Sequence, residues 1–344
     1  MLELLNKDLV LSKYDFGKEF KSGNEAMHVA LTGTENYIPW IGVTMTSILE
    51  HNKEEKFCFH LLLDSLGDKE NSNLSKFSRQ WNVPVHVYVM NDESISKFGK
   101  FTRYIIDGKF VGAFIYRFFI PCVLDTNIKK VLYIDGDIVC NGKLSDLFEM
   151  DLMGNSVAVS EDIQGEIYAK NFNLKKYFNS GVLLIDTCNW NRKILTIKLL
   201  KGLEKALNTK IDLPCPDQDI LNIVLENETL FVSQKYNLPY RLVRPSVFKA
   251  KIVNGDAEHA SLIHFIGAIK PWTSYNQSVP IVKVWAHAKA NSPWKDVSLH
   301  EPDSQKAIHQ AAREARSQGR YGKMLIWYLK FIKSKIDGTR KVGY

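Results

Sequence analysis

Apolar runs of strand length alternate with helical stretches in the first part of the chain. The apolar runs lie at 28–33 (HVALTG), 57–63 (FCFHLLL) and 83–90 (VPVHVYVM), and helical stretches at 37–52 and 67–80 separate them. Strands that alternate with helices are typical of a mostly parallel sheet with helices on both faces. We therefore predict an α/β fold, in which ligands bind beyond the carboxyl ends of the strands.

The second half of the chain continues this pattern with shorter elements. Its 344 residues are 45% hydrophobic and 24% charged, which allows a sizeable core and excludes a disordered chain or a disulfide-stapled miniprotein. The expected elements are strands at 131–134, 156–160, 181–186 and 261–265, one helix over 190–207 and another that begins near Asp217.

Cysteine usage and the N-terminal residues point to the cytosol. Five cysteines occur without a CxxC pair, which favours reduced thiols over a disulfide framework or a zinc ribbon. Charges are spread through the first 20 residues, so these residues lack the apolar core of a signal peptide. Uncharged apolar runs all fall short of the roughly 18 residues that a transmembrane helix needs. We expect a soluble protein, or one that at most lies on a membrane surface.

The positive charge is concentrated near the C-terminal end of the sequence. The whole chain has 45 Lys and Arg against 38 Asp and Glu, and residues 301–344 hold ten of the former and four of the latter. The rest of the chain is therefore almost neutral. Within the basic stretch 304–336, helical spacing places a set of apolar residues on one face. These residues are Met324, Trp327, Tyr328, Phe331 and Ile332.

This basic amphipathic pattern favours a helix that lies in a membrane interface, with its cations near anionic headgroups. The alternative is a C-terminal helix that packs on the protein's own core and leaves its lysines in solvent. Nucleic-acid binding is a third option, but it lacks a supporting motif and the nearly neutral body argues against it. We therefore expect no nucleic-acid partner.

Asp135 and Asp137 flank Gly136 directly after the apolar run 131–134. Two carboxylates without a nearby cation repel each other, and a divalent metal between them removes that repulsion. Asp and Gly are also common in turns, so an isolated DGD has an ordinary structural explanation. Its position at the end of a buried strand favours the metal site, and a second motif has to decide.

That second motif is HFIGAIKPW at 264–272. The neutral imidazole of His264 can bind a transition metal, and the ammonium of Lys270 can neutralise a phosphate. Gly267 lets the backbone approach an anion closely. Two carboxylates and an imidazole suit Mn²⁺ or Mg²⁺, and the nitrogen ligand favours Mn²⁺.

Four motifs in this order resemble family 8 glycosyltransferases, which are retaining enzymes that use a nucleotide-diphosphate sugar. They are DGD, FNSGVLLID at 178–186, PDQDILN at 216–222 and HFIGAIKPW. The resemblance runs from about residue 29 to 272, and continues into the tail for the branch that builds lipopolysaccharide outer core. It implies a GT-A fold, a Rossmann-like and mostly parallel sheet, followed here by a basic helical extension.

The resemblance also implies roles for individual residues, each of which has an ordinary structural alternative when it is read alone. Thr34 is a departure, because relatives often carry an aspartate there that contacts the base. The implied metal ligands are Asp135, Asp137 and His264, and the implied donor-binding residues are Ala30, Thr34, Asn36, Tyr37, Arg117, Gly136, Asn179, Gly267 and Lys270.

The implied chemistry centres on Gln218, which matches the family position on the face of the sugar opposite the leaving group. An amide is a poor nucleophile compared with the carboxylates of retaining glycosidases. We therefore favour front-face attack by the acceptor hydroxyl, with the leaving phosphate oxygen as its base. A covalent intermediate through Asp217 or Asp162 is the less favoured route, and Asp219 is expected to shape the same edge.

These observations predict an N-terminal extension (1–25), a glycosyltransferase domain (26–275) and a C-terminal helical, membrane-surface region (276–344). The expected function is transfer of glucose or galactose from its UDP donor to a core sugar of lipopolysaccharide, on the cytoplasmic face of the inner membrane. A family 8 transferase with a capsule, protein or polysaccharide acceptor is one alternative. A non-catalytic protein that binds sugar nucleotides or a membrane surface is the other.

Overall fold

The computed structural model describes residues 9–20, 26–96, 105–106, 109–110, 112–209, 211–242 and 257–336. Parts of the predicted N-terminal extension (1–8 and 21–25) and of the C-terminal region (337–344) lie outside these residues. The main sheet has eight strands in the order β1-β4-β3-β2-β7-β10-β9-β11. Its strands are β1 (Val10–Phe16), β2 (Met27–Gly33), β3 (Phe57–Leu63), β4 (Val85–Met90), β7 (Lys130–Ile134), β9 (Val157–Glu161), β10 (Phe178–Asp186) and β11 (Thr229–Val232).

The sheet is mixed but mostly parallel, which confirms the predicted α/β class. β2, β3, β4 and β7 run parallel to one another, as do β9 and β11, whereas β10 is antiparallel to both of its neighbours. β1 was not predicted. It falls within the predicted extension and pairs antiparallel with β4 at the sheet edge.

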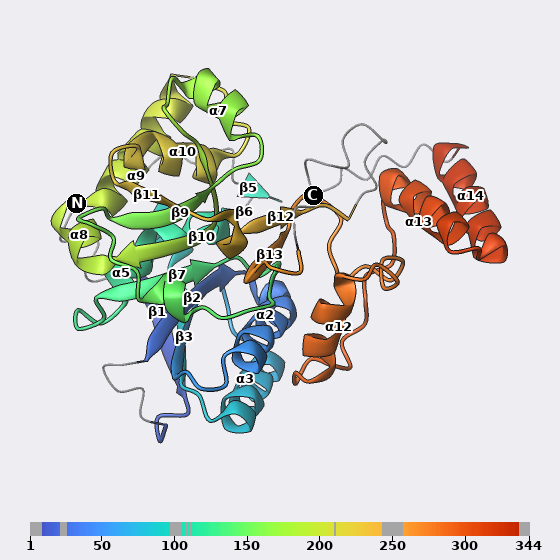
Figure 1. Cartoon of the computed structure of the whole chain (residues 1–344), viewed down its shortest axis with the longest axis horizontal. Coiled ribbons are helices and arrows are strands. Elements are labelled where there is room, and N and C mark those ends of the chain that lie inside the picture. The colour runs from blue at the N-terminus through green and yellow to red at the C-terminus, as the bar shows by residue number, and fades with distance from the viewer. Residues whose placement is uncertain are drawn as a thin grey trace.

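Helices cover both faces of this sheet, as Figure 1 shows, with α2 and α3 on one side and α9 and α10 on the other. The apolar residues of each strand alternate between two buried clusters, one under each helical layer. The helices of the two layers and their neighbours are α2 (Ile38–His51), α3 (Asp68–Trp81), α4 (Asp92–Ser96), α5 (Ile120–Val123), α6 (Ser145–Phe148), α7 (Gly165–Phe172), α8 (Thr187–Arg192), α9 (Leu195–Asn208) and α10 (Pro216–Leu225).

A second, smaller sheet in the order β12-β13-β8 lies beside the carboxyl ends of the main strands. Its strands are β8 (Ile138–Cys140), β12 (Leu238–Tyr240) and β13 (Leu262–Phe265). A third apolar cluster behind it contains Trp40, Trp272 and Trp285, and the rings of Trp40 and Trp272 stack at 5.0 Å. A two-stranded ribbon, β5 (Ile105–Ile106) with β6 (Lys109–Phe110), completes the described strands.

The single helix predicted over 190–207 was wrong, because two helices, α8 and α9, meet at Ile194. Ile194 has a left-handed backbone, with φ of 50°. The turn lets the buried indole of Trp190 donate a hydrogen bond to the Thr196 hydroxyl, and that hydroxyl donates to the carbonyl of Phe118. The burial of Trp190 thus takes the place of the backbone hydrogen bonds that one continuous helix would form between α8 and α9.

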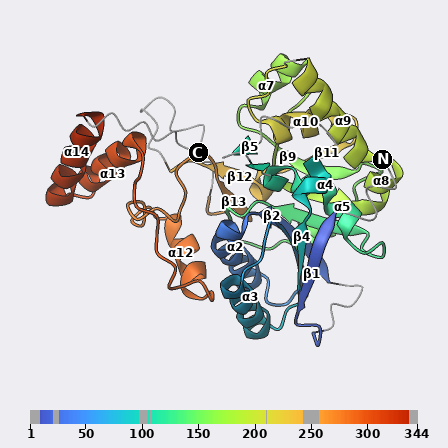
Figure 2. The ribbon, with the colours of Figure 1, turned by 180° about the vertical axis from the view of Figure 1, so that it is seen from behind.

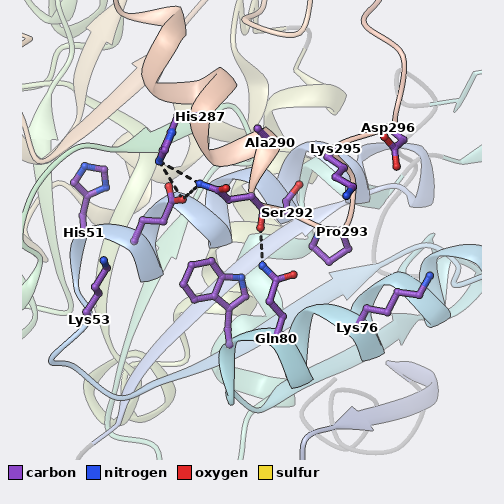
Figure 3. Close-up of a pocket in the computed structure, with 13 residues that line it drawn as sticks. His51, Lys53, Lys76, Gln80, His287, Ala290, Ser292, Pro293, Lys295 and Asp296 are labelled. Atoms are coloured by element: carbon purple, nitrogen blue, oxygen red, sulfur yellow. Dashed lines mark hydrogen bonds and ion pairs between the residues drawn. The ribbon is translucent and has the colours of Figure 1, made fainter.

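The segment after α12 (Val282–Ala290) packs across α2 and α3. Trp294 is fully buried, and its Nε1 donates a 2.6 Å hydrogen bond to a Glu70 carboxylate oxygen on α3. A Cβ at Gly42 on α2 would lie 2.1 Å from the Trp294 ring, so only glycine leaves room for it. Beside this contact is a cavity of about 900 Å³, across which the side chain of Gln80 donates to the Asn291 carbonyl (Figure 3).

The basic stretch forms two helices, α13 (Gln305–Ser317) and α14 (Tyr321–Ile336), which pack against each other. Both views show this helical hairpin set apart from the main sheet (Figures 1 and 2). The chain turns at Gly319, which has a φ of 68°. None of the described helices combines the length and the hydropathy needed to cross a bilayer.

The apolar face predicted for the membrane was wrong in part, because most of it packs inside the hairpin. Met324, Trp327, Tyr328 and Phe331 are half-buried, and the rings of Tyr328 and Phe331 contact His309 on α13. The apolar stripe of α14 that faces outward shares only Ile332 with the predicted face. It consists of Tyr321, Leu325, Ile326, Leu329 and Ile332, each with more than half of its surface exposed.

Candidate active site

The DGD motif lies where the main sheet gives way to the small sheet. β7 ends at Ile134, the motif follows, and β8 starts at Ile138. β13 pairs with β8 so that His264 lies opposite Ile138. Asp135 and Asp137 therefore stand at the carboxyl end of a central strand, and the small sheet brings His264 to them.

Asp135, Asp137 and His264 converge closely enough to share one cation. The Nε2 atom of His264 lies 3.2 Å from an Asp137 carboxylate oxygen and 3.8 Å from one of Asp135, and one ligand atom from each residue lies within 4.8 Å of the others. His264 Nδ1 is 3.0 Å from the Asn237 side-chain oxygen. A proton on Nδ1 that Asn237 accepts leaves the Nε2 lone pair directed at the carboxylates. These donors fit a divalent metal such as Mn²⁺ or Mg²⁺.

Gly181 in the middle of β10 makes this convergence possible. A Cβ there would lie 2.3 Å from His264 Cε1 and 3.0 Å from an Asp135 carboxylate oxygen. Any larger residue would push the imidazole or the carboxylate away. Gly181 was not among the predicted site residues, although a glycine inside an apolar strand indicates close approach by another group.

Two cations stand against the carboxylates. Lys270 pairs with Asp137 and donates a 2.8 Å hydrogen bond to the Phe265 carbonyl. Arg117 Nη2 lies 3.2 Å from an Asp135 oxygen and 3.4 Å from an Asp217 oxygen. These five side chains comprise three carboxylates and two cations. The excess of negative charge favours binding of a further cation.

Burial and pairing set the charge state of these groups. Burial alone would raise the pKa of Asp137, but the Lys270 ammonium and His264 outweigh it and hold that pKa far below its ordinary value. Burial alone would lower the pKa of the Arg117 guanidinium. The carboxylates of Asp135 and Asp217 outweigh burial and raise this pKa above its ordinary value, so Arg117 stays charged. Burial raises the pKa of Asp217 despite the opposing effect of Arg117.

Gln218 and Asn179 lie next to this cluster with their amides held in place. Gln218 Oε1 accepts a 3.0 Å hydrogen bond from the backbone N–H of Ser180, and its Nε2 donates to Tyr177 at 3.3 Å. Asn179 Nδ2 donates to an Asp162 oxygen at 3.0 Å, and its Oδ1 accepts from Asn237 at 2.9 Å. The structure therefore brings Gln218, Asn179 and Asp162 together at one edge.

Asp219 is placed differently from the other predicted acids. It is fully buried, accepts hydrogen bonds from the Tyr177 hydroxyl and the Cys215 backbone N–H, and so stabilises the first turn of α10. Asp217, two residues earlier in the same turn of α10, is partly exposed and faces Arg117.

The predicted nucleoside-binding residues lie around η1 (Glu35–Tyr37), just beyond the end of β2. The Tyr37 ring meets Trp272 edge to face at 5.4 Å, and a Cβ at Gly136 would come within 3.1 Å of that ring. Asn36 is exposed and Thr34 is partly exposed at the same edge.

Two predicted contact residues differ in accessibility. Ala30 lies in the middle of β2 without exposed surface, so the structure does not bring its side chain to the edge. Gly267 is exposed and has a φ of 87°, and apart from its two chain neighbours no atom of the described residues lies within 4 Å of where a Cβ would stand. The loop therefore has open space at Gly267 where a side chain would otherwise stand.

Comparison with known proteins assigns the chain to a family. The model of glycosyl transferase family 8 matches residues 28–276, and the model of the family 8 C-terminal region matches residues 280–335. The chain belongs to glycosyl transferase family 8. Its membership makes it a glycosyltransferase, as the four ordered motifs predicted.

Similar family 8 proteins match along most of their length. The lipopolysaccharide glucosyltransferase WaaO of Escherichia coli K12 is 27% identical over 94% of this chain and 96% of its own. A lipopolysaccharide 1,2-glucosyltransferase of the same strain is 30% identical over 85% of this chain and 86% of its own. The lipopolysaccharide 1,3-galactosyltransferase of Salmonella typhimurium is 24% identical over 96% of this chain and 97% of its own.

Solved structures confirm the predicted GT-A fold. The galactosyltransferase LgtC, solved with donor and acceptor sugar analogues, aligns with a TM-score of 0.60 at 20% identity, over 77% of this chain and 96% of its own. The bifunctional glycosyltransferase WbbM aligns with a TM-score of 0.61 at 20% identity, over 79% of this chain and 50% of its own.

Proposed function

We propose that this family 8 enzyme transfers glucose or galactose from a UDP-sugar to a hydroxyl of a hexose in the lipopolysaccharide core, with an alpha linkage and retention of configuration. The observation that carries the proposal is the convergence of Asp135, Asp137 and His264 next to Lys270 and Gln218. The acceptor class is inferred from relatives that are named for lipopolysaccharide and that match the chain through its C-terminal region. Residues 26–275 would form the catalytic domain and 276–344 the membrane-surface region.

In this proposal Asp135, Asp137 and His264 would hold Mn²⁺ or Mg²⁺, and the ion would supply positive charge for the departing diphosphate. Lys270 is paired with Asp137, one of the proposed metal ligands, and its ammonium would contact the phosphates there. Arg117 forms an ion pair with Asp135 and so orients its carboxylate. Thr34, Asn36 and Tyr37 would line the uridine.

The hydrogen bonds around Gln218 support front-face attack. Its amide is fixed by Ser180 and Tyr177, so it can lie against the sugar as a neutral, oriented dipole. Asp217 is paired with Arg117, and Asp162 accepts hydrogen bonds from Asn179 and the Gln164 backbone. Carboxylates that are already engaged are weaker nucleophiles, which disfavours a covalent intermediate at either aspartate.

The proposal is tested with the full chain, UDP-glucose and UDP-galactose, and a panel of truncated lipopolysaccharide acceptors. We expect one UDP-sugar to give an alpha-linked product by NMR, with activity lost in EDTA and restored by Mn²⁺ or Mg²⁺. Transfer only to capsule, protein or polysaccharide acceptors would support the alternative acceptor. Failure of every UDP-sugar to release UDP in the presence of metal would overturn the enzymatic proposal.

We further propose that the hairpin lies on the anionic cytoplasmic face of the inner membrane. Its outward stripe includes Leu325 and Leu329, both more than half exposed, and Lys323, Lys330 and Lys333 are exposed along the same helix. Apolar side chains between lysines are typical of interfacial helices.

The double variant Leu325→Glu/Leu329→Glu should bind anionic vesicles at least tenfold more weakly. Each leucine side chain that enters the membrane would contribute about 1.5–3 kcal/mol to binding, and glutamate would lose this contribution. Sedimentation with vesicles that contain anionic phospholipid measures this. Leu11→Glu, which changes an exposed leucine on β1, is the matched control and should bind like wild type. Equal binding by all three proteins would exclude the stripe as the membrane contact.

A further inference from the structure

A second cluster of metal-binding side chains lies at the other end of the main strands. His28 is near the start of β2, Cys58 and His60 are in the first half of β3, and His86 is near the start of β4. His28 pairs in register with Cys58, and His60 with His86. All four side chains therefore point to the same face of the sheet. The DGD motif follows the opposite, carboxyl end of β7.

His28 and Cys58 both approach the Nε2 atom of His60. His60 Nε2 lies 2.9 Å from His28 Nδ1 and 3.6 Å from Cys58 Sγ, and the three ligand atoms lie within 4.8 Å of one another. Zinc bonds of about 2.0–2.1 Å to nitrogen and 2.3 Å to sulfur place tetrahedral ligands roughly 3.3 Å (N to N) and 3.5 Å (N to S) apart. Both distances to His60 Nε2 come within a few tenths of an ångström of this geometry, and the distance from His28 Nδ1 to Cys58 Sγ is no more than 4.8 Å.

The groups around the cluster orient His60 as a ligand. Its Nδ1 lies 3.3 Å from the Tyr88 hydroxyl, so an Nδ1 proton donated to Tyr88 leaves the Nε2 lone pair toward His28 and Cys58. His86 stacks on His60 at 5.3 Å, and its Nδ1 is 2.7 Å from an Asp15 oxygen. His86 thus packs beside the three residues and does not join them.

The cluster is reachable from solvent. Cys58 and His60 are 1% and 2% exposed, while His28 is partly exposed and lines a pocket of about 500 Å³ together with Asp15 and Asp125. This pocket offers an entry path and room for a fourth ligand.

Lysines that line the same pocket are engaged elsewhere. Lys130 donates to the carbonyls of Phe148 and Met150, and Lys129 donates to the carbonyl of Thr126. Backbone carbonyls therefore hold the ammonium groups of Lys129 and Lys130, whereas Lys13 Nζ lies over the Tyr88 ring, 5.1 Å from its centroid.

We propose that His28 Nδ1, Cys58 Sγ and His60 Nε2 bind one Zn²⁺ ion, with a water molecule from the pocket as the fourth ligand. Thiolate with two imidazoles is a donor set that selects zinc over the hard cations suited to Asp135 and Asp137. Binding forms the Zn–S bond as the Cys58 thiol releases its proton to solvent. The ion would join β2 to β3 at the end of the sheet remote from the active site, as a structural centre.

Cobalt provides a spectroscopic test that does not depend on glycosyl transfer. The full chain is stripped with chelator and titrated with Co²⁺. We expect one equivalent to produce a thiolate-to-cobalt charge-transfer band in the near ultraviolet and the visible bands of a tetrahedral ion, both removed by one equivalent of Zn²⁺. A folded wild-type protein without the charge-transfer band would overturn the proposal, whatever the outcome of the transfer assays.

Single-residue variants identify the cysteine that gives the charge-transfer band. Cys58→Ser should abolish it, and the exposed Cys188→Ser should retain it. Asp137→Asn should also retain it, which separates this centre from the candidate active site. If Cys58→Ser does not fold, His28→Asn should shift the visible bands and weaken Co²⁺ binding at least tenfold. A band lost in Cys188→Ser and kept in Cys58→Ser would assign it to the surface thiol and reject the site.

Discussion

Asp137→Asn should reduce kcat/KM for glycosyl transfer by about a thousandfold, which is the size of effect expected when a group that positions transition-state charge is removed. The amide would keep the shape of Asp137 but lose a metal ligand, the partner of Lys270 and a contact of His264. Initial rates with the productive UDP-sugar, measured across a range of Mn²⁺ concentrations, check this result. Saturating metal should not restore the rate.

Asp146→Asn is the matched control, because Asp146 is an exposed aspartate on α6, outside the DGD motif. It should retain the wild-type rate. Circular dichroism melts of both variants report whether folding accounts for a loss. If folded Asp137→Asn kept activity within a few fold of wild type, the assignment of Asp137 to the metal and donor site would be wrong.

Trp294→Ala should lower the free energy of unfolding by about 3–5 kcal/mol, the usual range for deletion of a fully buried tryptophan. The change would empty the space over Gly42 and leave the Glu70 carboxylate without its indole donor. Urea unfolding followed by circular dichroism measures the difference. The slope with urea should stay close to that of wild type.

Trp327→Ala serves as the comparison, since Trp327 is only half-buried between the helices of the hairpin. Its effect should be clearly smaller. Equal decreases in the free energy of unfolding for the two variants would mean that the contact of Trp294 with α2 contributes no more to stability than the contacts of Trp327 do.

The fold was largely predictable from apolar periodicity, because the buried strands are continuous apolar runs. β2, β3 and β7 lie within one residue of the predicted ranges. β1 was missed because it alternates half-buried and exposed residues, such as Leu11, and pairs only along one edge. The break at Ile194 was missed because a distant contact of Trp190 decides it.

The candidate site was predictable to the extent that its residues sit in motifs. The DGD and HFIGAIKPW motifs are 127 residues apart in numbering, from 137 to 264, and the register of β13 with β8 brings them together. Asn237 and Ser180, which orient His264 and Gln218, were not predicted. Their roles depend on which distant side chains they face, and local spacing carries no such information.

The contact of Trp294 with Gly42 has a consequence for biosynthesis. About 250 residues separate the two, so at 5–20 residues per second a ribosome needs roughly 13–50 s to supply the indole after α2 has been made. Until then, the surface around Gly42 that Trp294 later covers stays open on the nascent chain. We expect ribosome-associated chaperones to protect this surface until Trp294 has left the ribosome and can cover it.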